Sequence, residues 1–236
     1  MDPLVYKHDA LGALIDVLKK HNPDIITIQE SHTDDGANQA AIIAKELGLE
    51  FVANDVYDES HLEPGQGLSQ AVISRFPIKN HSFLMFYNPH LETLSPTGER
   101  WLSHDKGVTT CLVDLGNGIT MNVKTSHSFP YRRFHIEPFD EKLIPLRADM
   151  AEKLKPDSDI YLYKGDLNYN EYSVEPLLPD LIKDGIKEVI LSEPTTPKGR
   201  KYDHVIYKGI RHINSVVIND TLTDHFPIYS EFDIQA

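Results

Sequence analysis

The chain has 236 residues, and 36 Asp and Glu against 23 Lys and Arg give it a formal net charge of −13. A hydrophobic content of 40% with 25% charged residues is typical of a globular protein and excludes a disordered tail or a fibre. A chain this acidic has no net attraction to DNA or to an anionic membrane, so a phosphate-bearing partner must be held by local cations or by metal ions. The single cysteine, Cys111, excludes an internal disulfide.

The first half of the chain predicts two helices and then mostly sheet. Apolar residues at helical spacing over 11–18 predict a helix, which Pro23 separates from a short buried strand over 24–29. A second helix is predicted over 36–47 and ends at Gly48. Strands are expected over 51–53, 69–74 and 79–87. The run Gly-Asn-Gly at 116–118 predicts a hairpin between two strands, because these residues tolerate positive φ.

The second half predicts one helix among further strands. Leucine and methionine recur at helical spacing over 143–154, and Pro145 must lie in the first turn of this helix or kink it. Strands are expected over 159–164, 203–207, 213–218 and 228–232. Because no linker or repeat divides the chain, we expect a single domain over residues 1–236 with helices outside packed sheets. No signal peptide or integral membrane segment is predicted, and a cytoplasmic location is expected.

Acidic residues and histidines fall where the predicted strands begin and end, which is where a rigid scaffold meets solvent. These residues are Glu30, His127, Asp166, Asn168, Asp203, Asp224 and His225. Converging carboxylates repel one another unless a cation lies among them, and a hard divalent ion such as Mg²⁺ prefers oxygen ligands. A histidine beside an acid, as in Asp224-His225, can act as a general base. Each residue alone fits an ordinary turn or rim position, so the prediction depends on their combination.

Six short motifs occur together in a fixed order and cover nearly the whole chain. They are PDIITIQE ending at Glu30, AVISRFPI at 71–78, TSH ending at His127, GDLN at 165–168, YDHVIY from Tyr202 and TDHFPI at 223–228. In this order they resemble the endonuclease/exonuclease/phosphatase superfamily, the fold group of pancreatic deoxyribonuclease. The resemblance implies an α/β fold, a four-layered α/β/β/α sandwich of two mixed sheets with the site at one edge.

The resemblance also implies a role for each matched residue. Glu30 would bind the metal, which would be Mg²⁺ or Mn²⁺, and Asp224 would bind metal or hold the site together. Asp166 would orient the attacking water and Asn168 would contact the phosphate. Asp203 would support His225 beside the scissile phosphate, and His127 would donate to a phosphate oxygen.

The start of the chain departs from the pattern of the family. The family normally opens with a strand that carries a metal-site Asn, whereas MDPLVYKHDA before Leu11 has neither the Asn nor the length. We therefore expect the fold to lack the first strand of the family, and we hypothesise a truncated start. The alternatives are water in place of the missing ligand and a weakened site. A missing central strand would leave apolar sheet edges unpaired.

The loop after His127 carries aromatic and basic residues that suit a nucleic-acid strand. Arg132 and Arg133 could pair with phosphate and Tyr131 could stack on a base. The same sequence is also expected if the aromatic residues belong to the core and the arginines form a solvated rim. The long segment 83–106 is predicted to form a second specificity loop.

The sequence thus predicts divalent-metal-dependent hydrolysis of a phosphoester, most simply by a nuclease or a DNA-end phosphodiesterase. One alternative is an enzyme for a small or lipid-linked phosphoester such as an inositol phosphate or a sphingomyelin-like head group, which the acidity of the chain favours. The other is a binding module of the same fold with weakened catalysis.

Overall fold

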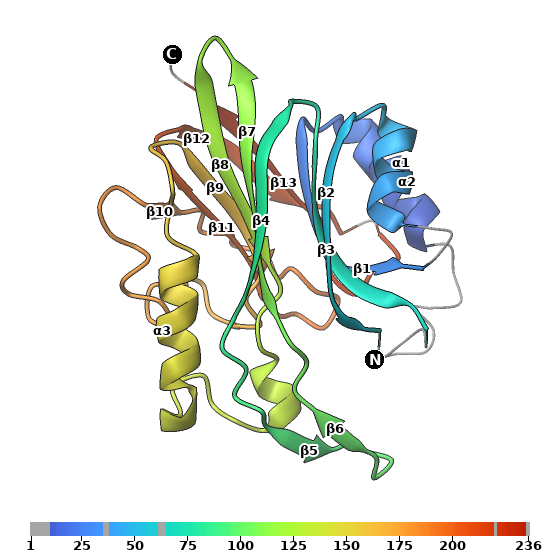
Figure 1. Cartoon of the computed structure of the whole chain (residues 1–236), viewed down its shortest axis with the longest axis vertical. Coiled ribbons are helices and arrows are strands. Elements are labelled where there is room, and N and C mark those ends of the chain that lie inside the picture. The colour runs from blue at the N-terminus through green and yellow to red at the C-terminus, as the bar shows by residue number, and fades with distance from the viewer. Residues whose placement is uncertain (1–9, 35–37, 61–64, 220, 235–236) are drawn as a thin grey trace.

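The computed structural model describes residues 10–34, 38–60, 65–219 and 221–234. Two facing sheets form its centre, with two helices outside one sheet and a third helix outside the other (Figure 1). The predicted four-layered sandwich is therefore confirmed. The helices are α1 (Ala10–His21), α2 (Gln39–Leu47) and α3 (Ile144–Lys153), with 3₁₀ turns at Tyr131–Phe134 and Glu141–Leu143.

The smaller sheet has the strand order β1-β3-β2. Its strands are β1 (Ile25–Thr33), β2 (Phe51–Glu59) and β3 (Gly67–Ser74). Both strand pairs are antiparallel, so the prediction of two mixed sheets is wrong for this sheet as far as the described residues go. The central strand β3 is buried on both faces because α2 covers one face and the second sheet covers the other, and its sequence GLSQAVIS accordingly lacks charge.

The larger sheet has the order β10-β11-β9-β8-β7-β4. Its strands are β4 (Ile78–Met85), β7 (Gly107–Gly116), β8 (Ile119–Ser126), β9 (Tyr161–Asp166), β10 (Lys187–Glu188) and β11 (Asp203–Lys208). Only the β8–β9 pair is parallel, which makes this sheet mixed as predicted. The crossover between β8 and β9 contains α3, the connection that a parallel pair requires.

Two further hairpins lie outside these sheets. One pairs β12 (Arg211–Val217) with β13 (Ile228–Asp233). The other pairs β5 (Glu92–Leu94) with β6 (Arg100–Leu102) and projects beyond the sandwich at the bottom of Figure 1. The long segment 83–106 therefore contains a folded hairpin, and its strand β5 contacts the 3₁₀ turn at Tyr131–Phe134.

Three apolar clusters fill the spaces between the four layers. One packs Ile15 and Ile43 of the helices against β1 and β3. A second lies between the sheets and includes Val72 and Val123. The third packs Met150 of α3 against the far face of the larger sheet. Each sheet buries both faces, and this explains why the interior strands read as apolar runs in the sequence.

Local sequence signals explain how the helices begin and end. Asn38 caps α2 by accepting from the Ala41 amide at 3.2 Å, and Gly48 ends it with φ +67°. Pro145 lies in the first turn of α3, the first of its two predicted positions.

No helix among the described residues is long and apolar enough to cross a bilayer. The expected absence of a first strand concerns residues 1–9, which lie outside the described residues.

Gly165 allows β9 to approach β8 more closely than a residue with a side chain would. A Cβ at this position would lie 2.5 Å from the Ser126 carbonyl oxygen, a backbone atom that cannot rotate away. We expect Gly165→Ala to lower the free energy of unfolding by about 1–3 kcal/mol, measured by chemical denaturation. Gly165→Val should cost more. An alanine variant as stable as the parent protein would contradict this close packing.

Candidate active site

Strand register brings three of the predicted site residues together at one end of three neighbouring strands of the larger sheet. Asp166 ends β9 and pairs directly with Asp203, the first residue of β11. On the other side of β9, His127 forms a parallel bridge with Asp166 just beyond the end of β8. Neighbouring strands lie about 4.8 Å apart, so this register alone places the three side chains together.

Glu30 reaches the same place from the other sheet through an irregularity in β1. The pairing of β1 with β3 shifts register between Ile28 and Ser31, and Glu30 within this bulge has φ +54°. A non-glycine residue in the left-handed region costs about 1–3 kcal/mol and re-aims its side chain. Oε1 of Glu30 lies 3.5 Å from Nδ1 of His127, so the bulge directs the carboxylate across the space between the sheets.

His225 and Asp203 form the tightest pair of the site. Nδ1 of His225 lies 2.8 Å from Oδ2 of Asp203, and its Nε2 lies 3.8 Å from Oδ2 of Asp166. Burial alone would lower the pKa of His225, but the charge and hydrogen bond of Asp203 outweigh burial and raise the pKa to about 11. His225 is therefore a cation at neutral pH. Exposed Asp224 lines the same groove as His225, Asp203 and Asp166.

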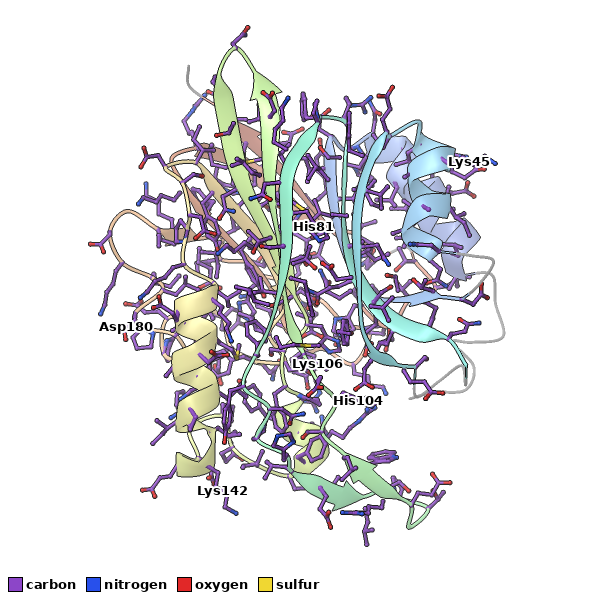
Figure 2. All side chains as sticks on the ribbon, in the orientation of Figure 1. Lys45, His81, His104, Lys106, Lys142 and Asp180 are labelled. Atoms are coloured by element: carbon purple, nitrogen blue, oxygen red, sulfur yellow. The ribbon has the colours of Figure 1, made fainter. Side chains whose placement is uncertain are left out.

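His127 is buried and takes the opposite protonation state. Burial and the Lys106 ammonium group lower the pKa of His127 to about 3. Nζ of Lys106 lies 3.0 Å from Nδ1 of His127, so Nδ1 accepts that hydrogen bond and the ring proton is on Nε2. Nε2 lies 3.6 Å from Oδ2 of Asp166. Figure 2 shows Lys106 above the β5–β6 hairpin.

Asn168 is held by two hydrogen bonds just after β9. Its backbone amide donates to Oδ1 of Asp166 at 2.6 Å, and its side-chain amide donates to the Ser128 carbonyl at 3.1 Å. Its φ of +52° is a conformation that asparagine adopts more readily than most residues. These contacts fix the loop that follows β9 against the loop that follows β8.

The cluster fits a divalent cation by both geometry and charge. One polar atom from each of Asp166, Asp203 and His225 lies within 4.8 Å of the others, and because His225 is a cation the potential metal ligands among them are the two carboxylates. With Glu30 and Asp224 the site contains four carboxyl groups, close to the cations His225, Lys106 and Arg133. Burial raises the pKa of Asp166, so its charged form needs a nearby cation. Carboxylate oxygens suit Mg²⁺ or Mn²⁺.

The basic loop after His127 divides into an exposed part and a core part. Arg132 is exposed, and the Arg133 guanidinium lies 4.9 Å from the centre of the Trp101 ring on β6. Tyr131 is only 2% exposed and packs with Phe129 and Phe134 in the apolar cluster that also contains Met150. The predicted contact of Tyr131 with substrate is therefore at odds with its burial, because a core ring cannot stack on a base. Arg132 and Arg133 are the side chains of this loop that remain available for contact with a substrate.

Gln70, Lys106 and Tyr57 complete the site, and the sequence did not indicate them. Gln70 is fully buried, and its amide donates to the carbonyls of Gly107 and Thr125 and to the Thr109 hydroxyl. Its Oε1 accepts from the His127 amide at 3.3 Å. Lys106 lies over the Tyr57 ring, 5.1 Å from its centre. A polar residue inside an apolar strand, as in LSQAVIS, was the available signal for Gln70.

Comparison with known proteins shows the family of the chain. The sequence profile of the Endonuclease/Exonuclease/phosphatase family matches residues 5–225, so the chain belongs to that family. Members of this family hydrolyse phosphoester bonds and are generally dependent on divalent metals. A search among curated proteins finds no match.

Solved structures share the fold at low sequence identity. An endonuclease/exonuclease/phosphatase from Beutenbergia cavernae DSM 12333 has a TM-score of 0.72 at 16% identity, over 95% of this chain and 66% of that one. D. rerio TDP2, complexed with a single strand DNA product, has a TM-score of 0.66 at 14% identity, over 95% and 92% of the two chains. The Bacteroides thetaiotaomicron VPI-5482 mannosyl-6-phosphatase has a TM-score of 0.64 at 14% identity, over 94% and 90%.

Replacing Gln70 tests whether it holds His127 in place. Gln70→Leu keeps the side chain's bulk but leaves the His127 amide and two carbonyls without their partner. We expect the free energy of unfolding to fall by about 2–5 kcal/mol, measured by denaturant titration. Gln29→Leu is the matched control, because Gln29 is only half-buried and a smaller loss is expected. Equal losses in the two variants would argue against a special role for Gln70.

Proposed function

We propose that this protein is a divalent-metal-dependent phosphoesterase. The observation that carries the proposal is the convergence of Asp166, Asp203 and His225 within 4.8 Å, with Glu30 directed at the same point from the opposite sheet. Carboxylates in such numbers are stable together only around a cation, and a metal beside a histidine cation suits a phosphate with its negative oxygens. The family of the chain and the chemistry of its site thus support the same reaction.

We assign each residue of the site one role in the reaction. Glu30 and Asp224 would hold the Mg²⁺ or Mn²⁺, which when bound supplies positive charge at the phosphate. Asp166 would orient the attacking water, and Asn168 would contact a phosphate oxygen. His127 carries its proton on Nε2 and would donate it in a hydrogen bond to a second oxygen.

His225 would act as a cation rather than as the general base that the sequence suggested. Its pKa of about 11 leaves it protonated at neutral pH, and Asp203 fixes its orientation at 2.8 Å. A protonated imidazole can donate to the scissile phosphate and stabilise negative charge as it grows. The general-base interpretation would require a neutral ring.

For the substrate we propose DNA, with a nuclease or DNA-end phosphodiesterase activity. Exposed Arg132 and the Arg133–Trp101 pair lie on the loop that begins at His127, so a strand whose phosphate enters the site would run over them. TDP2, a structural neighbour, is complexed with a single strand DNA product. These two arginines give local positive charge beside the site in a chain whose net charge is −13.

A small or lipid-linked phosphoester is the second candidate, and the net charge of −13 favours it. An acidic surface repels an extended duplex but accepts a compact substrate whose phosphate meets only the metal and its neighbours. A structural neighbour is a mannosyl-6-phosphatase.

Metal removal and site variants test the reaction itself. Activity on a panel of single-stranded and duplex DNA, blocked DNA ends, inositol phosphates and a chromogenic phosphodiester should need Mg²⁺ or Mn²⁺ and disappear in EDTA. We expect Asp166→Asn and His225→Gln to lower kcat at least about 100-fold, because the first removes the carboxylate that orients the attacking water and the second removes the positive charge beside the phosphate. Asp149→Asn on α3 is the matched control and should leave kcat unchanged.

Activity that survives EDTA, or that is unaltered in both site variants, would overturn the mechanism. If no substrate of the panel turns over but a metal-dependent phosphate ligand still binds, the chain is a binding module rather than an enzyme.

The salt dependence of binding tests the DNA proposal. Arg132→Ala with Arg133→Ala should weaken binding of a single-stranded oligonucleotide and lower the slope of log K against log salt by about 0.7 for each phosphate that the protein no longer neutralises. Lys20→Ala with Lys45→Ala removes the same charge from α1 and α2, and Figure 2 shows Lys45 far from Lys106. This control should keep the slope. An equal slope in both double variants would favour the small-phosphoester candidate.

A further inference from the structure

A pocket with a volume of 280 Å³ lies at the end of β11 that is far from the candidate active site. Asp203 begins β11 at the site and Lys208 ends it, so roughly 17 Å of extended strand separates the two places. Three of the seven residues that line the pocket are cations, Lys187, Lys208 and Arg211, and none is acidic. The pocket therefore differs from the active site in both its position and its charge.

Strand register and two glycine turns shape this pocket. Lys187 on β10 pairs with Tyr207 on β11, which places the two side chains on the same face of the sheet. The chain leaves β11 at Gly209, where φ is +71° and a Cβ would collide with the Asp159 carbonyl oxygen. Gly185, just before β10, has φ +83°, and a Cβ there would meet no atom within 4 Å. Both turns therefore need glycine, and no side chain fills the pocket at Gly185.

Carboxylates compensate the cations of the pocket only in part. Arg211 donates from Nε and Nη2 to Oδ2 of Asp233 on the neighbouring strand β13, at 3.2 and 2.6 Å. Lys187 and Lys208 form no ion pair within the parts of the chain that the structure describes. Positive charge thus gathers at this pocket in a chain whose net charge is −13.

The lining of the pocket suits a small ligand that carries a phosphate group. Cations gathered around one space repel one another unless an anion lies among them. Guanidinium and ammonium groups together form several charge-assisted hydrogen bonds to the oxygens of a phosphate. Tyr207 and Ile210 complete the lining with a ring and an apolar side chain, which suit the organic part of a ligand. The volume lies just below the usual range for ligand pockets, about 300–1,000 Å³, so the ligand is small.

We propose that this pocket binds the phosphate group of a small ligand, either inorganic phosphate or a nucleoside monophosphate. Arg211, which Asp233 holds through Nε and Nη2, would donate to a phosphate oxygen from Nη1. Lys187 and Lys208 would supply positive charge at the other oxygens. Unlike the active site, this pocket needs no metal, because its own side chains are positive. The proposal is independent of the proposed phosphoesterase activity.

Binding in the presence of EDTA tests the pocket apart from the active site, whose carboxylates repel phosphate when no metal is bound. Inorganic phosphate and adenosine 5′-monophosphate are titrated separately into the purified chain, and binding is followed by calorimetry and by backbone amide chemical shifts. We expect saturable binding of at least one of them, with the largest shifts over 185–187 and 207–211. The tighter ligand then shows whether the phosphate is free or carried by a nucleoside.

Double variants of equal charge test which cations hold the phosphate. Lys187→Ala with Lys208→Ala should weaken binding at least tenfold, because both ammonium groups of the pocket are lost. Lys19→Ala with Lys79→Ala is the matched control, since it removes the same charge from α1 and β4, where each lysine pairs with a carboxylate. The control should bind phosphate as tightly as the parent protein does. Equal weakening in both double variants would show a response to net charge alone and would overturn the proposal.

Variants of Arg211 separate a shaped site from a loose attraction to exposed lysines. Arg211→Ala should weaken binding at least tenfold, and Arg211→Lys, which keeps the charge but loses the planar guanidinium group, should weaken it at least threefold. Unchanged binding in Arg211→Ala, no saturable binding of either compound, or shifts confined to the active-site residues Asp166, Asp203 and His225 would overturn the proposal. All of these readouts are independent of catalysis, so the failure of this proposal and that of the proposed function are distinguishable.

Discussion

The site depends on the position of β9 between β8 and β11. This one strand sets the distance from Asp166 to His127 on one side and to Asp203 on the other, through a parallel bridge and an antiparallel pair. Gly165 permits the close approach because its missing side chain leaves room for the β8 backbone. A shift of one residue in this register would turn Asp166 to the opposite face of the sheet. The chemistry is therefore tied to the hydrogen-bond ladder rather than to flexible loops.

Two histidines in one small site differ in charge, because burial and Lys106 lower the pKa of His127 whereas Asp203 outweighs burial at His225. His225 faces Asp203 and is held as a cation, whereas His127 faces Lys106 and is held neutral. Their pKa values of about 11 and about 3 lie on either side of neutrality, so both states are stable over the ordinary pH range. The protein thus obtains a charged donor and a neutral donor from the same residue type.

Much of this arrangement could be predicted from the sequence, because it follows from local patterns. The strand DIYLYK and the hairpin Gly-Asn-Gly carry their own signals, and the order of the motifs placed Glu30, Asp166 and His225 together. Other features could not be predicted, since they depend on contacts between distant segments. Tyr131 is buried by the cluster that also contains Phe129 and Met150, and Gln70 reaches His127 only because the two sheets face each other. The sign of the His225 charge likewise depends on distances that no pattern contains.

The inward orientation of the two free strand edges has a consequence for how molecules of this protein meet one another. Exposed edges of flat strands are the usual starting points of sheet-to-sheet aggregation. Within the described residues, β1 and β13 line one groove together with α1 and the larger sheet, so these edges do not form a flat outer surface of the sandwich. Among the described residues, β1 and β13 therefore each keep one edge unpaired without presenting it as a flat outer surface.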